Sequence, residues 1–203
     1  MVSIVILAAG TSSRLGRPKQ LLDLGGEPLL RHVVRNALAS RAQEVVVVLG
    51  SQAEAIASAV GELGQRTVVN PDFADGQSTS LKAGIRAIDP NAQGVIMMLG
   101  DQPTVTPALL NRLISAYEAT GASIVQPVYG GTPGNPVLID RDYFPELLEI
   151  EGDQGARGVI KAHRRETYGM PWSDEPPPGD VDTEEEYQAL VAIWNSRPGH
   201  AQS

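Results

Sequence analysis

The chain has 203 residues, of which 42% are hydrophobic and 20% are charged, so it is long enough to bury a substantial core. It contains no cysteine, which excludes disulfide bonds and thiolate metal sites, and its net charge of −8 argues against a broad nucleic-acid-binding surface. The first apolar run is too short for a membrane span and lacks the basic flank of a secretory signal. We therefore expect a cytoplasmic protein that binds neither nucleic acid nor a membrane.

Short apolar runs and amphipathic stretches alternate along most of the chain. The apolar runs are typical of buried strands, whereas the amphipathic stretches repeat apolar side chains at helical spacing. This alternation predicts a three-layer α/β/α, Rossmann-like fold, in which helices cover both faces of a mostly parallel sheet. We expect strands at 2–9, 44–50, 66–69, 94–100 and 122–128, and helices at 29–38, 52–63, 78–88 and 107–117.

The remainder of the chain is less regular. After residue 126 it turns to Pro- and Gly-rich loops with short strands, and SDEPPPGD at 173–180 is typical of an extended connector. We expect a single domain over residues 1–195 and a flexible tail at 196–203.

Polar loops follow three of the expected strands. In an open α/β sheet the ligand binds at the carboxyl ends of the strands, so the loops at 9–27, 70–78 and 100–103 should meet at one site. Residues 1–41 hold six basic and two acidic side chains, a local charge of +4, whereas the rest of the chain carries −12. A small polyanion would therefore be drawn to the N-terminal segment.

The loop after the first expected strand continues as LAAGTSSRLGRPKQ, residues 7–20. It lacks both common nucleotide-binding patterns, because five residues rather than four separate Gly10 from Gly16 and no G-x-G-x-x-G is present. Its small residues would let a nucleotide approach the backbone, while Arg14 and Lys19 could reach phosphates. A solvated glycine-rich connection is the alternative interpretation.

This loop resembles the N-terminal signature of the MobA-like nucleotidyltransferases, L-A-[AG]-G-x-S-x-R-[ML]-G-x-x-K, and its Ala-Ala-Gly form resembles the molybdenum cofactor cytidylyltransferases. Further stretches match the family in the same order up to about residue 190: NPDFADGQSTSLKAGI, MLGDQPTV, GTPGNPVLI, EGDQGAR and DVDTEEEY. The resemblance implies a fold of the nucleotide-diphospho-sugar transferase type. It also implies transfer of CMP from CTP to the phosphate of molybdopterin cofactor with release of pyrophosphate, and a molybdoenzyme or its chaperone as a protein partner.

The resemblance assigns a role to each charged residue of the first loop. Lys19 would contact the α-phosphate of the nucleotide, and Arg14 the β- and γ-phosphates. Asp101 would bind a Mg²⁺ cofactor that bridges the triphosphate, because a hard carboxylate suits this ion. Asp-Gln-Pro is also favourable turn chemistry, which would explain Asp101 without a metal.

The second metal ligand has two candidates. Alignment by resemblance places Asp182 at the ligand position and leaves Asp180 as the alternative. The helix that follows is expected to begin with a capping box between Thr183 and Glu186, which accounts for those two residues without a functional role.

The stretch DGQSTS is expected to recognise the base. Gly76 permits close approach, and Ser80 matches a serine that contacts cytosine in related cytidylyltransferases. Ser78 and Thr79 are equally suited to cap the following helix. Asn70 and Gln102 are weaker candidates for the base. The expected nucleotide-binding residues are Leu7, Ala8, Ala9, Gly10, Arg14, Lys19, Asn70, Gly76 and Ser80.

The acceptor is expected to bind at Asn135, Asp153 and Arg157. Many relatives have His at the position of Asn135, so the identity of the acceptor stays open. Relatives that use GTP tend to carry Gly at the position of Ala9, which favours CTP for this chain. Two alternatives remain: a nucleotidyltransferase for another small phosphorylated acceptor, and a catalytically silent nucleotide-binding regulator.

Overall fold

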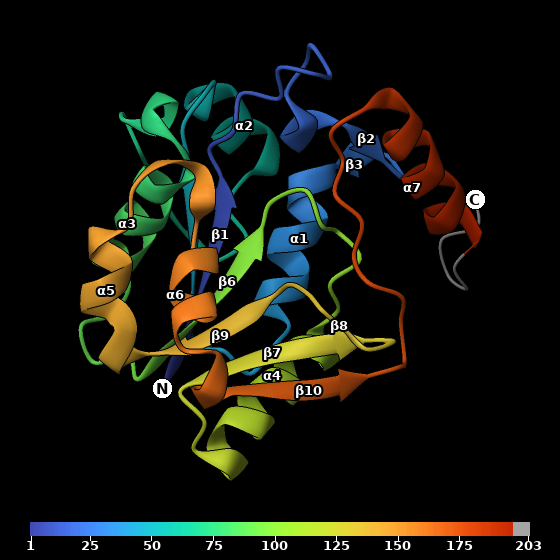
Figure 1. Cartoon of the computed structure of the whole chain (residues 1–203). Coiled ribbons are helices and arrows are strands. Elements are labelled where there is room, and N and C mark those ends of the chain that lie inside the picture. The colour runs from blue at the N-terminus through green and yellow to red at the C-terminus, as the bar shows by residue number, and fades with distance from the viewer. Residues whose placement is uncertain (197–203) are drawn as a thin grey trace.

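The structure is a computed structural model that describes residues 1–196. An eight-stranded mixed sheet lies at its centre, with the strand order β10-β7-β9-β6-β1-β4-β5 and with β8 paired to β7 (Figure 1). The strands of this sheet are β1 (Val2–Ala8), β4 (Glu44–Leu49), β5 (Arg66–Val69), β6 (Gly94–Leu99), β7 (Ile124–Tyr129), β8 (Thr132–Pro133), β9 (Val137–Asp140) and β10 (Thr167–Trp172). A separate hairpin consists of β2 (Asp23–Leu24) and β3 (Glu27–Pro28).

The sheet is mostly parallel, as the sequence predicts. β1 pairs in parallel with both β4 and β6, β4 with β5, and β10 with β7. β8 pairs antiparallel with β7, and β9 lies between β6 and β7 and runs antiparallel to both. Its buried side chains Val137, Leu138 and Ile139 explain why this short segment occupies the middle of the sheet.

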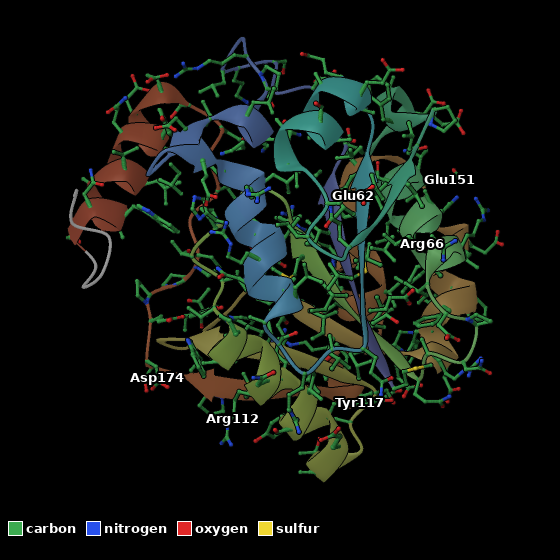
Figure 2. All side chains as sticks on the ribbon, turned by 180° about the vertical axis from the view of Figure 1, so that it is seen from behind. Glu62, Arg66, Arg112, Tyr117, Glu151 and Asp174 are labelled. Atoms are coloured by element: carbon green, nitrogen blue, oxygen red, sulfur yellow. The ribbon has the colours of Figure 1, made fainter. Side chains whose placement is uncertain are left out.

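Helices cover both faces of the sheet. α1, α2, α4 and α7 share one core with the sheet, and α3, α5 and α6 share the other, so the predicted three layers are confirmed. Figure 2, seen from behind, shows α1 and α4 against the near face, with Tyr117 labelled on α4. The helices are α1 (Leu29–Leu38), α2 (Ala53–Val60), α3 (Gln77–Ala87), α4 (Pro107–Thr120), α5 (Phe144–Glu149), α6 (Arg157–Ala162) and α7 (Glu184–Ser196).

The strand β1 shows how the two cores are divided. Ile4 and Ile6 point to the core of α1 and Val5 to the core of α3, as the alternation of side chains along a strand requires. Helix α7 extends through Ser196, and the rest of the expected tail, 197–203, lies outside the described residues. None of the helices within residues 1–196 has both the length and the apolar character to cross a membrane.

Glu27, at the end of the hairpin, is bound by two arginines of α1. Its carboxylate accepts hydrogen bonds from Arg35 at 2.8 Å and from Arg31 at 3.2 Å. The hydrogen bond from Arg35 is the main cause that lowers the pKa of Glu27 to about 2, although burial opposes the shift. The ionised carboxylate therefore stabilises the folded state.

We expect Glu27→Gln to lower the free energy of unfolding by about 0.5–1 kcal/mol at pH 7, the range for an exposed ion pair. Since the folded pKa of Glu27 lies below the unfolded value of 4.5, this difference is complete above about pH 5 and shrinks as the pH falls toward 2. Urea unfolding of both proteins at pH 7 and pH 3.5 measures it. An equal difference at both values would contradict the assignment.

Candidate active site

A cavity of about 410 Å³ opens at the carboxyl edge of the parallel strands. The loops after β1, β5 and β6 all line it, so the convergence expected from the sequence is observed. The connector before α7 also contributes. The lining includes Leu7, Ala8, Ala9, Gly10 and Lys19 from β1 and its loop, Gly76 and Ser80 from the second loop and α3, Asp101 from the third loop, and Asp180 and Asp182 from the connector.

The buried side chain of Gln20 shapes the loop after β1. Its Nε2 donates hydrogen bonds to the carbonyl oxygens of Ala8 at 2.8 Å and Gly10 at 3.3 Å. The Oγ of Ser12 accepts a hydrogen bond from the backbone N–H of Lys19 at 3.1 Å. The loop therefore folds back on itself and places Lys19 beside the end of β1.

The loop that carries Asp101 is packed against β1. The backbone N–H of Gly100 donates to the carbonyl oxygen of Leu7 at 2.9 Å. A Cβ atom at Gly100 would lie 2.8 Å from the Cβ of Ala8, so only glycine allows this approach. Asp101 follows at once and is held at the floor of the cavity, with a side chain that is 6% exposed.

The ammonium group of Lys19 joins two carboxylates. Its Nζ lies 2.5 Å from Asp101 Oδ2 and 3.0 Å from Asp182 Oδ1. Burial raises the pKa of Asp101 while Lys19 opposes this rise, and the hydrogen bond from Lys19 lowers the pKa of Asp182. Burial alone lowers the pKa of Lys19, but the two carboxylates outweigh it and raise the net value. The two acidic side chains thus converge on one cationic position.

The connector places both of its aspartates at the cavity. Val181 is 1% exposed and anchors the segment in the core, while Asp180 and Asp182 on either side of it line the cavity. They differ in their partners, because Asp180 Oδ1 accepts from Gln102 Nε2 at 2.7 Å and has no ion pair with Lys19 among the described residues. Gln102 therefore tethers the connector to the loop after β6.

A capping box starts α7, as predicted. The backbone N–H of Glu186 donates to Thr183 Oγ1 at 3.2 Å, and Glu186 Oε2 accepts from the backbone N–H of Thr183 at 2.9 Å. The same Oε2 also accepts from the backbone N–H of Asp182 at 2.8 Å. The cap thus fixes the backbone at Asp182.

Two arginines of the loop after β1 form ion pairs with acidic residues at the start of α7 and just before it. Arg14 lies 2.9 Å from Asp182 and Arg17 lies 2.8 Å from Glu184. The guanidinium of Arg17 also stacks 5.5 Å from the ring of Tyr187. The local charge of +4 expected to attract a polyanion is therefore partly compensated here, and Arg14, which is 74% exposed, does not line the cavity.

Helix α3 is capped by a residue distant in the sequence. The helix begins at Gln77, whose backbone N–H donates to Asp153 Oδ1 at 3.1 Å. The expectation that Ser78 or Thr79 caps this helix is wrong, because both lie inside it. The segment around Asp153 could not be placed here from local sequence, since 76 residues separate the two partners.

Asn70 supports the first turn of α3. Its Nδ2 donates to Thr79 Oγ1 at 2.8 Å and to Ser80 Oγ at 3.0 Å. Asn70 is buried and is absent from the lining of the cavity, whereas Ser80 is part of it. Within the described residues, Asn70 therefore acts on the cavity through Ser80.

A family model matches most of the chain. The MobA-like NTP transferase domain aligns with residues 4–167, which include most of β1 and all of β4, β5, β6, β7 and β9. The chain belongs to this family. It is a nucleotidyltransferase of the MobA-like type, and most of the residues that line its cavity lie within the matched range.

Relatives within and around the MobA-like family differ in their activities. The chain is 32% identical to nicotine blue oxidoreductase of Paenarthrobacter nicotinovorans, over 94% of this chain and 96% of that protein. It is 27% identical to molybdenum cofactor cytidylyltransferase of Escherichia coli, over 73% of this chain and 74% of that protein.

Solved structures of similar proteins share the whole fold. The Rv0371c homologue from Mycobacterium sp. strain JC1 has a TM-score of 0.86 and 35% identity, covering 95% of this chain and 96% of that chain. Rv0371c of Mycobacterium tuberculosis in complex with manganese has a TM-score of 0.81 and 31% identity, covering 94% of this chain and 98% of that chain.

The structure brings together most of the residues expected for a MobA-like site, but not all. Arg157 and Asp153 line the main cavity, while Asn135 lines a smaller neighbouring one. Sequence reasoning missed Gln20 and Gln77, which both line the main cavity. The sequence signal for Gln20 is its place directly after the family lysine, and the signal for Gln77 is its place in the stretch DGQSTS, which is expected to recognise the base.

Gly76 lies close to the backbone of Gly152. Its φ of +109° is a glycine conformation, and a Cβ atom would lie 2.8 Å from the carbonyl carbon and oxygen of Gly152. Gly76→Ala is expected to lower the free energy of unfolding by about 2–3 kcal/mol and to weaken nucleotide binding. Urea unfolding and CTP titration measure these effects.

Gly16→Ala is the matched control. Its φ is +69°, but a Cβ atom there would meet nothing within 4 Å. It should therefore cost only the backbone strain of about 1 kcal/mol. If the two variants were equally stable and bound CTP equally, the contact between Gly76 and Gly152 would have no role in shaping the cavity.

Proposed function

We propose that this chain transfers CMP from CTP to the phosphate of a molybdopterin-type cofactor and releases pyrophosphate. Lys19 lies between Asp101 and Asp182, beside a loop of small residues, and this position is the observation that best supports nucleotidyl transfer. The similarity to the Escherichia coli cytidylyltransferase supports the choice of CTP and of the acceptor. In this proposal residues 1–195 act as a single domain.

Asp101 and Asp182 are the proposed ligands of Mg²⁺. Their oxygens contact the same ammonium group, at 2.5 and 3.0 Å, so the pair already converges on one cation. Carboxylate oxygens are the ligands that Mg²⁺ prefers. The manganese complex of Rv0371c supports a divalent ion in this fold. When bound, the ion would neutralise negative charge on the triphosphate.

The protein side chains supply position and charge. The backbone of the loop after β1 would hold the nucleotide, with Lys19 donating hydrogen bonds to the α-phosphate and Arg14 to the β- and γ-phosphates. Arg14 can do so by leaving Asp182, because its side chain is 74% exposed. An oxygen of the acceptor phosphate then attacks the α-phosphorus, and the bond from this phosphorus to the pyrophosphate oxygen breaks.

The methyl group of Ala9 is proposed to favour CTP over GTP. Ala9 is 5% exposed and lines the cavity, and the proposal places the base beside it, where the methyl group would narrow the space for a purine. Ala9→Gly should relax the preference by about 1–2 kcal/mol, because one methyl group gives only modest discrimination. The ratio of kcat/KM for CTP and GTP in both proteins measures it. An unchanged ratio would remove Ala9 from base selection.

Pyrophosphate release with each of the four NTPs, across a panel of phosphorylated acceptors, tests the proposed function. The expected result is release that needs Mg²⁺, CTP and molybdopterin-type acceptor together. Release with a different small phosphate would replace the acceptor but keep nucleotidyl transfer. Nucleotide binding without release under any condition would identify the chain as a silent regulator.

A further inference from the structure

A second cavity of about 70 Å³, here called the side chamber, adjoins the main cavity. It lies between β1, β6, β9, α3 and α6, on the side of the sheet that α3 and α6 cover. Residues lining both cavities are Leu7, Gln77, Leu99 and Arg157. A ligand in the main cavity can therefore extend into the side chamber.

Apolar side chains form the floor and walls of the side chamber. Leu81, Met97 and Val137 are buried in the core beneath α3 and α6, and Ala156 and Ile160 are half-buried beside them. The volume of the side chamber, about 70 Å³, is much smaller than the 410 Å³ of the main cavity. It therefore suits a compact apolar group, such as the edge of a flat ring.

Three amide side chains surround this apolar floor. Gln77, Asn135 and Gln154 each line the side chamber. None of their side-chain amides has a hydrogen bond to another of the residues that the structure describes, since only backbone atoms of Gln77 and Asn135 are engaged. An apolar floor with a few convergent polar groups is typical of a small-molecule site. Amides can pair with both donors and acceptors on the edge of a heterocycle.

An unpaired cation marks the junction of the two cavities. Lys19 and Arg157 are the two basic residues that line the main cavity. Lys19 is bound by carboxylates, whereas Arg157 has no ion pair or side-chain hydrogen bond within residues 1–196. A guanidinium group presents a planar set of donors that matches a phosphate or carboxylate. An anionic group is thus the expected partner of Arg157.

We infer that the side chamber holds the ring end of the acceptor while Arg157 binds its phosphate at the junction. The acceptor class that fits is a small phosphate ester whose flat, largely apolar ring has hydrogen-bonding atoms on its edge. This inference rests on the proposed function, because it places the acceptor beside the nucleotide. Asp153, which is also expected to bind the acceptor, lines the main cavity, and its Oδ1 accepts a hydrogen bond from the backbone N–H of Gln77.

The inference can be tested by calorimetry without turnover. Phenyl phosphate, inorganic phosphate and CTP with Mg²⁺ are titrated separately into the protein, and their three affinities are compared. Wild-type protein should bind phenyl phosphate at least fivefold more tightly than inorganic phosphate. Ala156→Leu and Ile160→Phe each add bulk to the side chamber, so they should remove this preference and leave the CTP affinity within twofold. Arg157→Gln should weaken both phosphates at least fivefold.

Ala162→Leu is the matched control, because Ala162 lies at the exposed end of the same helix and does not line the side chamber. It should leave all three affinities unchanged. Equal affinity of wild-type protein for phenyl phosphate and inorganic phosphate would overturn the inference. So would a loss of CTP affinity in Ala156→Leu, since the side chamber would then hold the nucleobase. Failure of nucleotidyl transfer with every acceptor would overturn the proposed function but not the measured preference for phenyl phosphate.

Discussion

Asp101→Asn is expected to lower kcat by at least about 100-fold, which corresponds to roughly 3 kcal/mol of lost transition-state stabilisation. A neutral amide is a poor ligand for Mg²⁺ and does not attract Lys19 as the carboxylate does. The protein should still fold, because the amide avoids the cost of burying a charge while it loses the ion pair with Lys19. Initial rates of pyrophosphate release and thermal unfolding of both proteins measure the two effects.

Asp180→Asn is the matched control for Asp101→Asn. Asp180 lines the same cavity, but its carboxylate accepts a hydrogen bond from Gln102 and does not contact Lys19 among the described residues. The substitution should therefore lower kcat by less than about tenfold. Near wild-type kcat in Asp101→Asn, or an equal loss in Asp180→Asn, would remove Asp101 from its proposed place as the main metal ligand.

Lys19→Gln is expected to lower kcat by about 100- to 1,000-fold, as for the loss of one charged donor to a transferred phosphoryl group. The same substitution should tighten Mn²⁺ binding in the absence of nucleotide, because the ammonium group contacts both proposed metal ligands. Arg14→Gln should have the smaller effect on kcat, since Arg14 is exposed and lies outside the cavity lining. Lys19→Arg should not restore activity, because a guanidinium group differs from an ammonium in shape and reach.

Rates of pyrophosphate release and electron paramagnetic resonance titration with Mn²⁺ separate the two roles of Lys19. Lower activity of Lys19→Gln together with tighter Mn²⁺ binding would indicate that the metal ion replaces the Lys19 ammonium group between Asp101 and Asp182. Mn²⁺ affinity that stays the same or falls in Lys19→Gln would show that the lysine and the ion do not compete for Asp101 and Asp182.

The sheet could be predicted from the sequence because its strands are continuous apolar runs. Residues 2–9 and 94–100 are such runs, and the structure has β1 and β6 there with only small differences at their ends. β9 was harder to predict, because Val137–Asp140 is short, follows a Pro- and Gly-rich loop and pairs antiparallel with β6, which lies far earlier in the sequence, as well as with β7. Local periodicity does not specify such a pairing.

The positions of the site residues followed from the topology, but their partners did not. Lys19 and Asp101 meet because the loops after β1 and β6 lie at one edge of the sheet. The capping of α3 by Asp153 and the pairing of Arg14 with Asp182 join residues 76 and 168 positions apart. These contacts depend on tertiary packing, so local sequence does not predict that Arg14 pairs with Asp182 or that Asp153 accepts a hydrogen bond from Gln77.

The fate of each phosphate of CTP tests nucleotidyl transfer most directly. CTP labelled with ³²P at the α- or the γ-position is incubated with the protein, Mg²⁺ and a molybdopterin-type acceptor, and the products are separated. The arrangement of Lys19, Asp101 and Asp182 predicts that the α-label joins the acceptor and the γ-label leaves as pyrophosphate. A γ-label released as inorganic phosphate, or CTP that is bound but not consumed, would contradict a nucleotidyl-transfer site.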